Sequence, residues 1–353
     1  MGGPPVSVVM PVRNALPYLD AAIQSILAQS YSDFEFVIRD DDSTDGSRER
    51  LRFWAKKDKR IRLFEGDKCL GPSGSSNWVV EHARAPIIAR MDADDVSLPD
   101  RLRRQLEMLR RSEDAVLVGS VWQGIDRHGR IVREPDLKAL RGGHFAAPFA
   151  HGSIMFRRDT FDLVGGYRPE CEFWEDLDFC LRMASLGRIL VSIEPLYQHR
   201  FSETSTRLTS GRSRVEQAVD LMFACRELYD QGLDYSALLA ARDFSRPDIK
   251  TNPNTLLSLA FITLWSGLRP PLLMPLLKRG QLGFDKASAR ALIWALWATV
   301  NPRTLRWVMR FLLHRRSSEV RKTLNGTIVC EWRPRGLPVP SATEQVSRAA
   351  LYA

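Results

Sequence analysis

The sequence has few cysteines, and no two of them form a C-x-x-C pair. Its five cysteines are scattered along 353 residues, and their number is odd. A disulfide framework needs an even set of paired cysteines, and a zinc site of the usual kind needs closely spaced ones. Both are therefore disfavoured, and we expect the protein to work in a reducing cytoplasm.

Long apolar runs are absent as well. The run Val6–Met10 is too short for the apolar part of a signal peptide, lacks a basic flank and ends at Pro11. Residues 256–277 come nearest to a membrane span, but Arg269 and three prolines interrupt them. A span needs roughly 18 apolar residues without such breaks. We therefore expect neither a signal peptide nor a membrane-spanning helix.

The composition that remains is that of a folded, basic protein. Hydrophobic residues make up 44% of the chain, which is enough for one large core or two domains. Charged residues make up 26%, a share that argues against disorder throughout. The formal net charge of +9 suits partners with negative charge, such as nucleic acid, anionic lipid or phosphorylated ligands.

Apolar strands alternate with helices in the first part of the chain. Four short segments have the apolar, β-branched character of buried strands, namely Val6–Met10, Phe34–Ile38, Ile61–Phe64 and Pro86–Met91. The alternation predicts an α/β fold with a mostly parallel, Rossmann-like sheet. Ligands bind such sheets outside the carboxyl ends of the strands. Two acidic clusters, residues 40–45 and 92–95, lie at such ends.

After about Thr206 the alternation stops. Segments rich in Leu, Trp and Arg predict a helical, basic region over residues 206–332, followed by a flexible tail over 333–353. Two interpretations of this region stay open. It forms a helical subdomain with its own core, or it attaches peripherally to an anionic membrane. Nucleic acid is not expected as a partner, because no recognised binding motif is present.

The cluster Asp92-Ala93-Asp94-Asp95 directly follows the fourth expected strand. Mg²⁺ and Mn²⁺ take oxygen ligands and are commonly held by one or two carboxylates plus substrate phosphates. Two carboxylates one residue apart can face one ion, which would neutralise a diphosphate leaving group. The competing interpretation is a polar turn before the helix that Pro99 and Asp100 introduce. For a D-x-D pattern alone, that turn is the commoner case.

Two further acidic segments carry a similar choice. A carboxylate in Asp40–Asp45, after the second strand, can accept the imide N–H of a uracil. Glu175 and Asp176 stand among aromatic residues, whose desolvating effect suits a general base. Each segment alone also fits an ordinary turn or helix start.

Together, in this order and spacing, these segments resemble the family 2 glycosyltransferases, which are inverting enzymes with the GT-A fold. The resemblance covers about residues 5–205. It is carried by VSVVMPVRN from Val6, SILAQSY from Ser25, the cluster 40–46, RMDADDVSLPDRLRRQ from Arg90, GGYR from Gly165 and WEDLDFCLR from Trp174. On this basis we divide the chain into a GT-A domain (1–205), the helical region and the tail.

The resemblance implies an inverting, metal-dependent hexosyltransferase of polysaccharide or glycolipid biosynthesis. Its donor would be a nucleotide sugar, with a UDP-sugar expected, and its cofactor Mn²⁺ or Mg²⁺. The acceptor would be a hydroxyl of a glycan or a lipid-linked molecule. The enzyme would be cytoplasmic, with a peripheral position at the cytoplasmic face of the membrane as an open alternative.

The resemblance also implies roles for individual residues on the donor side. The nucleotide base would be lined by Pro11, Val12, Arg13 and Asn14. Asp41 would bind uracil. Asp92 would contact the ribose or the metal, and Asp94 would ligate the metal.

On the acceptor side, Asp176 would be the base that deprotonates the acceptor hydroxyl. Glu175 and Asp178 would support that base or position the acceptor. His151 stays open between contact with the acceptor and a hydrogen bond within the protein.

The chain departs from the family pattern at several positions. Relatives often have Tyr where Arg13 stands, Gly where Asp42 stands and Arg where Ser76 stands. Many also carry a metal-reaching His where this chain has Ser202. His199 lies three residues earlier. It is either a metal ligand reached through a shifted loop or a surface or supporting histidine.

Two other functions compete with glycosyl transfer as interpretations of the acidic clusters. A sugar-1-phosphate nucleotidyltransferase also uses an acidic metal site, but usually has a Gly- and Arg/Lys-rich phosphate loop where this chain has Pro11–Asn14. A non-catalytic nucleotide-sugar or membrane-binding module has no chemical need for Asp92, Asp94 and Asp176 together.

Overall fold

The computed structural model describes residues 3–135, 149–171, 173–201, 321–324 and 327–332, together with Met222 and Cys225. The chain divides into two compact units, Met1–Ser210 with Glu319–Ala353, and Gly211–Ser318. The fold and the site below belong to the first unit.

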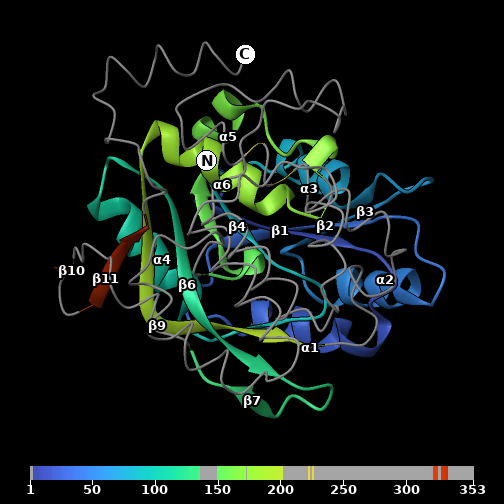
Figure 1. Cartoon of the computed structure of the whole chain (residues 1–353). Helices are drawn as coiled ribbons and strands as arrows, with labels where there is room; N and C mark the ends of the chain where they lie inside the picture. The colour runs from blue at the N-terminus through green and yellow to red at the C-terminus, as the bar shows by residue number, and fades with distance from the viewer. Residues whose placement is uncertain are drawn as a thin grey trace, which may run out of the picture. The chain divides into compact units, whose positions relative to one another are not determined.

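Four parallel strands form the N-terminal half of one mixed sheet (Figure 1). They are β1 (Val6–Val12), β2 (Phe34–Asp40), β3 (Ile61–Glu65) and β4 (Ile87–Arg90). β1 lies between β2 and β4, and β3 pairs with β2, all in parallel register. The expected strands and the α/β fold are therefore confirmed. The carboxyl ends of β1, β2 and β4 meet at one edge of the sheet.

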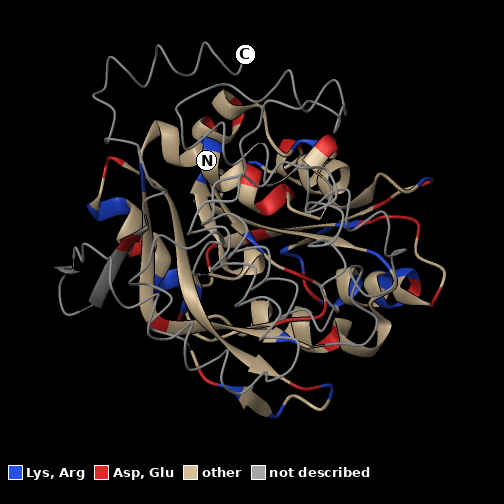
Figure 2. Ribbon diagram, viewed as in Figure 1, with Lys and Arg blue, Asp and Glu red and all other residues tan. Residues whose placement is uncertain are grey.

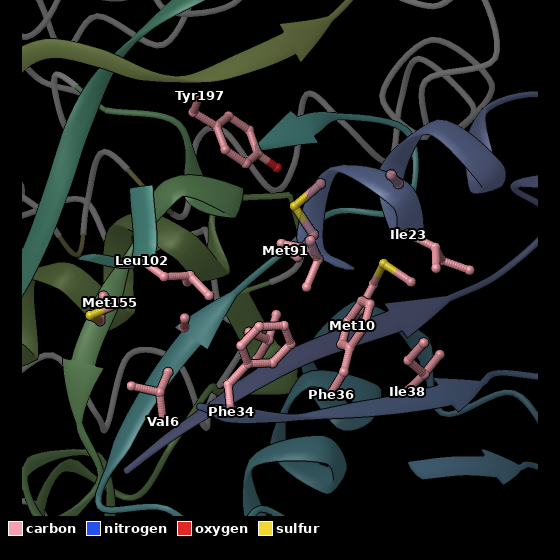
Figure 3. Packing of buried hydrophobic residues seen from close by; sticks show 14 of the residues in the cluster. Val6, Met10, Ile23, Phe34, Phe36, Ile38, Met91, Leu102, Met155 and Tyr197 are labelled. Atoms are coloured by element: carbon pink, nitrogen blue, oxygen red, sulfur yellow. The ribbon is translucent and has the colours of Figure 1, made fainter. Parts of the chain in front are cut away.

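Helices connect these strands and lie on both faces of the sheet (Figure 1). The helices of this half are α1 (Leu16–Leu27), α2 (Ser47–Lys57), α3 (Gly71–Glu81) and α4 (Arg101–Arg111). Pro17 stands in the first turn of α1, where its missing N–H costs no hydrogen bond. Leu19, Ile23 and Ile26 then recur at helical spacing and are fully buried. They join Met10, Phe36 and Leu102 in the core cluster shown in Figure 3.

The second half of the sheet is largely antiparallel. It contains β5 (Val96–Ser97), β6 (Ala115–Ile125), β7 (Ile131–Arg133), β8 (Met155–Arg157) and β9 (Arg188–Arg200). β8 pairs with β4 and β6, and β9 runs parallel to β6. Short helical segments complete this half: η2 (His151–Ser153), α5 (Arg158–Val164), η3 (Pro169–Cys171) and α6 (Glu175–Leu186).

The pairing of β5 with β9 is the link that builds the site. Val96 faces Gln198 and Ser97 faces Tyr197 in antiparallel register. The residues just before β5 are the acidic cluster 92–95, so the end of β9 lies against that cluster. Residues about one hundred positions apart in the chain are thereby placed side by side.

Two further strands extend the sheet beyond β9. They are β10 (Arg321–Leu324) and β11 (Thr327–Trp332), and β11 pairs antiparallel with β9. The helical prediction is wrong for these residues. Asn325-Gly326 is a typical hairpin sequence, and Thr327-Ile328-Val329 is β-branched. The helical prediction followed the composition of residues 206–332 as a whole rather than this short local pattern.

The other predictions for the C-terminal part fall on residues that the structure does not describe, apart from Met222 and Cys225. The domain boundaries, the helical, basic region before β10 and the flexible tail therefore stay predictions. Within the described ranges, no helix is long and apolar enough to cross a membrane.

Candidate active site

Asp95 anchors the acidic cluster to the end of β9. Its side chain is fully buried and accepts a hydrogen bond from the Arg200 backbone N–H at 2.7 Å. A second contact joins its Oδ2 to Nδ1 of His199 at 3.2 Å. Arg200 in turn donates from Nε to the Asp94 carbonyl oxygen at 2.7 Å. The loop that carries the cluster is thus held in one conformation.

Asp92 is held by a buried arginine from the end of β4. The Arg90 guanidinium donates from Nη1 to Oδ1 of Asp92, and this arginine side chain is only 8% exposed. Burial alone would raise the pKa of Asp92, but the charge and hydrogen bond of Arg90, together with other nearby groups, lower it overall. Asp92 therefore stays ionised and keeps Oδ2 for another partner.

Gly152 of η2 presses against the same aspartate. A Cβ added to this glycine would lie 1.9 Å from Oη of Tyr197 and 2.6 Å from Oδ2 of Asp92. Only a residue without a side chain permits such an approach. The Gly152 carbonyl accepts a hydrogen bond from Nη1 of the fully buried Arg101, which also donates to the Arg90 carbonyl. Arg101 thus ties η2 to the end of β4.

Asp94 is the carboxylate of the cluster that most needs a cation. Burial, followed by the charges of Asp95 and Asp92, raises the pKa of Asp94 to about 7. A bound divalent cation would remove this penalty. The described residues contain no group of three or more His, Cys, Asp or Glu side chains arranged to hold a metal. A cation here would use Asp94 and Asp92 and complete its shell from substrate oxygens, as Mg²⁺ commonly does.

His199 lies beside the cluster rather than away from it. Its Nδ1 is turned to Asp95, and its ring meets Trp122 edge-on with 5.3 Å between the ring centroids. Burial lowers the pKa of His199, but the hydrogen bond and charge of Asp95, together with the charges of Asp92 and Asp94, raise it overall. Only Nε2 is left to meet a ligand. Metal ligation by His199 stays a prediction, and Ser202 lies outside the described residues.

The segment expected to bind the nucleotide base, residues 11–14, ends β1 and contacts the loop after β2. Val12 is buried, Pro11 is half-buried, and Arg13 and Asn14 are exposed. The Asn14 backbone lies in the left-handed region, with φ at 50°. Its Oδ1 accepts from the Thr44 backbone N–H at 2.8 Å, and its own N–H donates to Oγ of Ser43. Asn14 therefore fixes the loop after β2.

Asp41 holds the start of α3. Its carboxylate accepts from the backbone N–H groups of Leu70 at 2.9 Å and Gly71 at 3.1 Å. Arg39 forms an ion pair with it at 3.4 Å, and the Asp41 side chain is only 4% exposed. The Arg13 guanidinium contacts the Cys69 sulfur close by. Direct contact of Asp41 with a uracil stays a prediction.

The acidic first turn of α6 forms the other side of the site and is coloured red in Figure 2. Glu175 and Asp176 are half-buried there. Asp178 is fully buried and pairs with Arg182, which also donates to the Val164 carbonyl of α5. Of the two roles expected for Asp178, its burial favours support of α6 over contact with an acceptor.

His151 makes an internal hydrogen bond. Its Nε2 lies 2.9 Å from Oη of the buried Tyr167. The backbone of Tyr167 is clamped by Asn77, which accepts from the Tyr167 N–H at 2.7 Å and donates to the Tyr167 carbonyl at 2.8 Å. Gly165 and Gly166, both at positive φ, form the turn before Tyr167.

The sequence did not predict four residues that surround Asp92. Arg90, Arg101, Gly152 and Tyr197 contact or approach the backbone and side chains of residues 90–92. Arg90 had a local signal, because a charged residue ends an otherwise apolar strand. Gly152 and Tyr197 had none, since their contacts depend on the pairing of distant strands.

Comparison with known proteins agrees with this architecture. The family model "Glycosyl transferase family 2" matches residues 7–164. The putative glycosyltransferase EpsE of Bacillus subtilis is 33% identical over 237 residues, which are 64% of this chain and 84% of that protein. The Escherichia coli protein WfgD, a UDP-Glc:alpha-D-GlcNAc-diphosphoundecaprenol beta-1,3-glucosyltransferase, is 31% identical over 115 residues. These are 33% of this chain and 45% of WfgD.

A solved structure shares the fold. It is the mannosyltransferase PcManGT from Pyrobaculum calidifontis, in complex with GDP-Man and Mn²⁺. The TM-score is 0.56 at 21% identity, covering 88% of this chain and 85% of that one. The likeness confirms the GT-A fold.

Proposed function

The chain belongs to glycosyl transferase family 2 and is a glycosyltransferase, and we propose that it transfers a hexose from a UDP-sugar to a hydroxyl with inversion, using Mn²⁺ or Mg²⁺. The observation that carries the proposal is the state of Asp94. This carboxylate is half-buried beside Asp92 and Asp95 after β4, and the pKa of Asp94 is raised to about 7. Such a cluster suits a substrate that brings a cation and a diphosphate together.

The residues on the donor side favour a uridine nucleotide as the ligand. The exposed Arg13 beside the loop held by Asn14 offers a flat cation on which a base can stack. Asp41 organises the start of α3 next to it. WfgD, by its name, uses UDP-Glc.

The mechanism needs a base on one side of the anomeric carbon and a stabilised leaving group on the other. When bound, a divalent cation supplies positive charge to the diphosphate. Asp94, with Asp92, would hold that cation, and Arg90 fixes Asp92. Asp176, in the first turn of α6, takes the proton from the acceptor hydroxyl as the new bond forms. Holding both substrates in line contributes much of the rate.

The acceptor is a hydroxyl of a glycan or a lipid-linked sugar. WfgD is named for an acceptor on diphosphoundecaprenol, and the first turn of α6 leaves Glu175 and Asp176 partly exposed to such a molecule. This places the reaction in polysaccharide or glycolipid biosynthesis. Peripheral attachment at the cytoplasmic face of a membrane is proposed on the same basis.

A donor screen tests the proposal. Purified protein is incubated with UDP-, GDP- and dTDP-sugars, with Mn²⁺ or with EDTA, and the released nucleoside diphosphate is measured. We expect a UDP-sugar to be consumed, EDTA to stop the reaction and Asp94→Asn to behave like EDTA. A protein that binds and consumes none of these donors would contradict the proposal, and activity unchanged by EDTA would contradict the metal requirement.

A further inference from the structure

His151 lies where the donor side and the acceptor side of the site meet. Its neighbour Gly152 approaches Oδ2 of Asp92, the donor-side carboxylate, so closely that no side chain fits between them. On the other side the His151 ring meets the Tyr167 ring at 5.3 Å between centroids. Tyr167 packs on Phe179 of α6, with 4.5 Å between the ring centroids, and the first turn of α6 carries Asp176.

The orientation of the His151 ring is set by its partner. Nε2 is held by Oη of Tyr167, and Tyr167 is itself clamped by Asn77. Within the described part of the chain, Nδ1 of His151 has no partner, yet it is not among the fully buried polar atoms. The ring direction is thus fixed, and Nδ1 is the nitrogen left for a ligand.

The charge state of the pair suits a hydrogen-bonding role. Burial, and then the charge of Arg90, lowers the pKa of His151 to about 3, so the ring is neutral. Burial also raises the pKa of Tyr167, which keeps its proton. A neutral imidazole of this kind is a poor base and does not compete with Asp176 for the acceptor proton. It can still orient a hydroxyl.

We propose that His151 is a substrate-contacting residue whose Nδ1 binds a hydroxyl of the acceptor next to the one that Asp176 deprotonates. Tyr167 is then a positioning residue that acts through His151. The inference rests on the proposed function and deepens it, since it assigns part of the acceptor site. The ligand class is a sugar or other polyol with two neighbouring hydroxyls.

The test compares three variants with the wild type. They are His151→Gln, Tyr167→Phe and, as the matched control, His128→Gln in the exposed turn before β7. Three quantities are measured: UDP affinity with Mn²⁺ by calorimetry, hydrolysis of the UDP-sugar without acceptor, and transfer to octyl β-D-glucoside and octyl N-acetyl-β-D-glucosaminide. We expect His151→Gln to raise the acceptor KM about tenfold, as loss of one hydrogen bond does.

In His151→Gln, UDP affinity and donor hydrolysis should stay within about twofold of the wild type, because the donor keeps all its contacts. Tyr167→Phe should raise the same KM by a smaller factor, and His128→Gln should leave it unchanged. An unchanged KM in His151→Gln would overturn the proposal. So would equal losses of UDP affinity, hydrolysis and transfer, because they would place His151 on the donor side or in the fold.

A nitrogen NMR measurement covers the case in which neither octyl glycoside is turned over. With ¹⁵N-histidine and the diamagnetic Mg²⁺–UDP complex, the His151 ring signals, identified by their loss in His151→Gln, should shift when an octyl glycoside is added. No shift would overturn the proposal. Failure of the wild type to bind UDP or to hydrolyse any donor would instead contradict the proposed function itself.

Discussion

Asp92 and Asp94 stand two residues apart, yet their surroundings shift their pKa values in opposite directions. For Asp94 the folded pKa of about 7 lies above the ordinary 3.8, so folding is penalised as the pH rises from about 4 to 7. For Asp92 the folded pKa is lowered, so its charge stabilises the fold at neutral pH and this stabilisation is lost in acid.

The two isosteric changes should therefore have opposite effects on metal-free protein. In EDTA at pH 8, Asp94→Asn should raise the free energy of unfolding by about 1–3 kcal/mol, and this gain should vanish near pH 4. Asp92→Asn should lower the free energy of unfolding at pH 8, because Arg90 loses its buried counter-charge. Urea unfolding at both pH values checks this. Equal signs for the two variants would contradict the electrostatic description of the cluster.

At the scale of residues, the sequence predicted the acidic side chains of the cluster but not the residues that bind and orient them. Asp92, Asp94 and Asp95 were found because carboxylates after a strand are a local pattern. The division of labour among them could not be found, since Asp95 is bonded to residues 199 and 200 and Asp92 to Arg90. Such contacts arise only when β5 pairs with β9 and η2 closes over the cluster.

Among the elements, α6 owes its position to a buried ion pair. Asp178 and Arg182, one helical turn apart, are both fully buried, and Arg182 also bonds the Val164 carbonyl of α5. Removing Arg182 takes from Asp178 the nearer of its two arginine partners, the other being Arg168 at 3.9 Å, and the loss of a buried ion pair is far costlier than that of a surface pair. Through Arg182, the pair ties α6, whose first turn carries Asp176, to the end of α5.

Arg182→Met should accordingly lower the free energy of unfolding by about 3–5 kcal/mol. Arg103→Met is the matched control, because Arg103 pairs with Glu107 at the same i,i+4 spacing on the exposed side of α4. That change should cost less than about 1 kcal/mol. Urea unfolding of both variants measures the two losses. Similar losses of unfolding free energy for both variants would show that the buried pair does not anchor α6.

Element prediction succeeded where the local pattern was strong and failed where distant pairing decided. The parallel strands β1 to β4 were read from short β-branched runs bounded by turn residues. β10 and β11 were missed, because the helical composition around them dominated the interpretation of residues 206–332. Their position beside β9 has a practical consequence: a truncation near Arg207 would remove two strands of the sheet.

At the scale of the whole molecule, two sets of strand ends converge on one site. The parallel half brings the loops after β1, β2 and β4 to one edge, and the antiparallel half adds η2, the end of β9 and the first turn of α6. The α/β class and the family were predictable from motifs in order along the chain. The closing of the site from the antiparallel half was not, because its strands carry no separate motif of their own.

Asp176 is proposed as the base of a single displacement, and the UDP-sugar donor is bound by other residues of the site. Asp176→Asn keeps the shape of the side chain but cannot take a proton. Asp162→Asn, an exposed acid of α5, serves as the control.

The most direct measurement is transfer of the UDP-sugar to an octyl glycoside, recorded together with UDP affinity in Mn²⁺. For Asp176→Asn we predict that transfer falls by at least about a hundredfold, as loss of a general base does, while UDP affinity stays within about twofold. Asp162→Asn should match the wild type. Transfer by Asp176→Asn at a near wild-type rate would contradict the account.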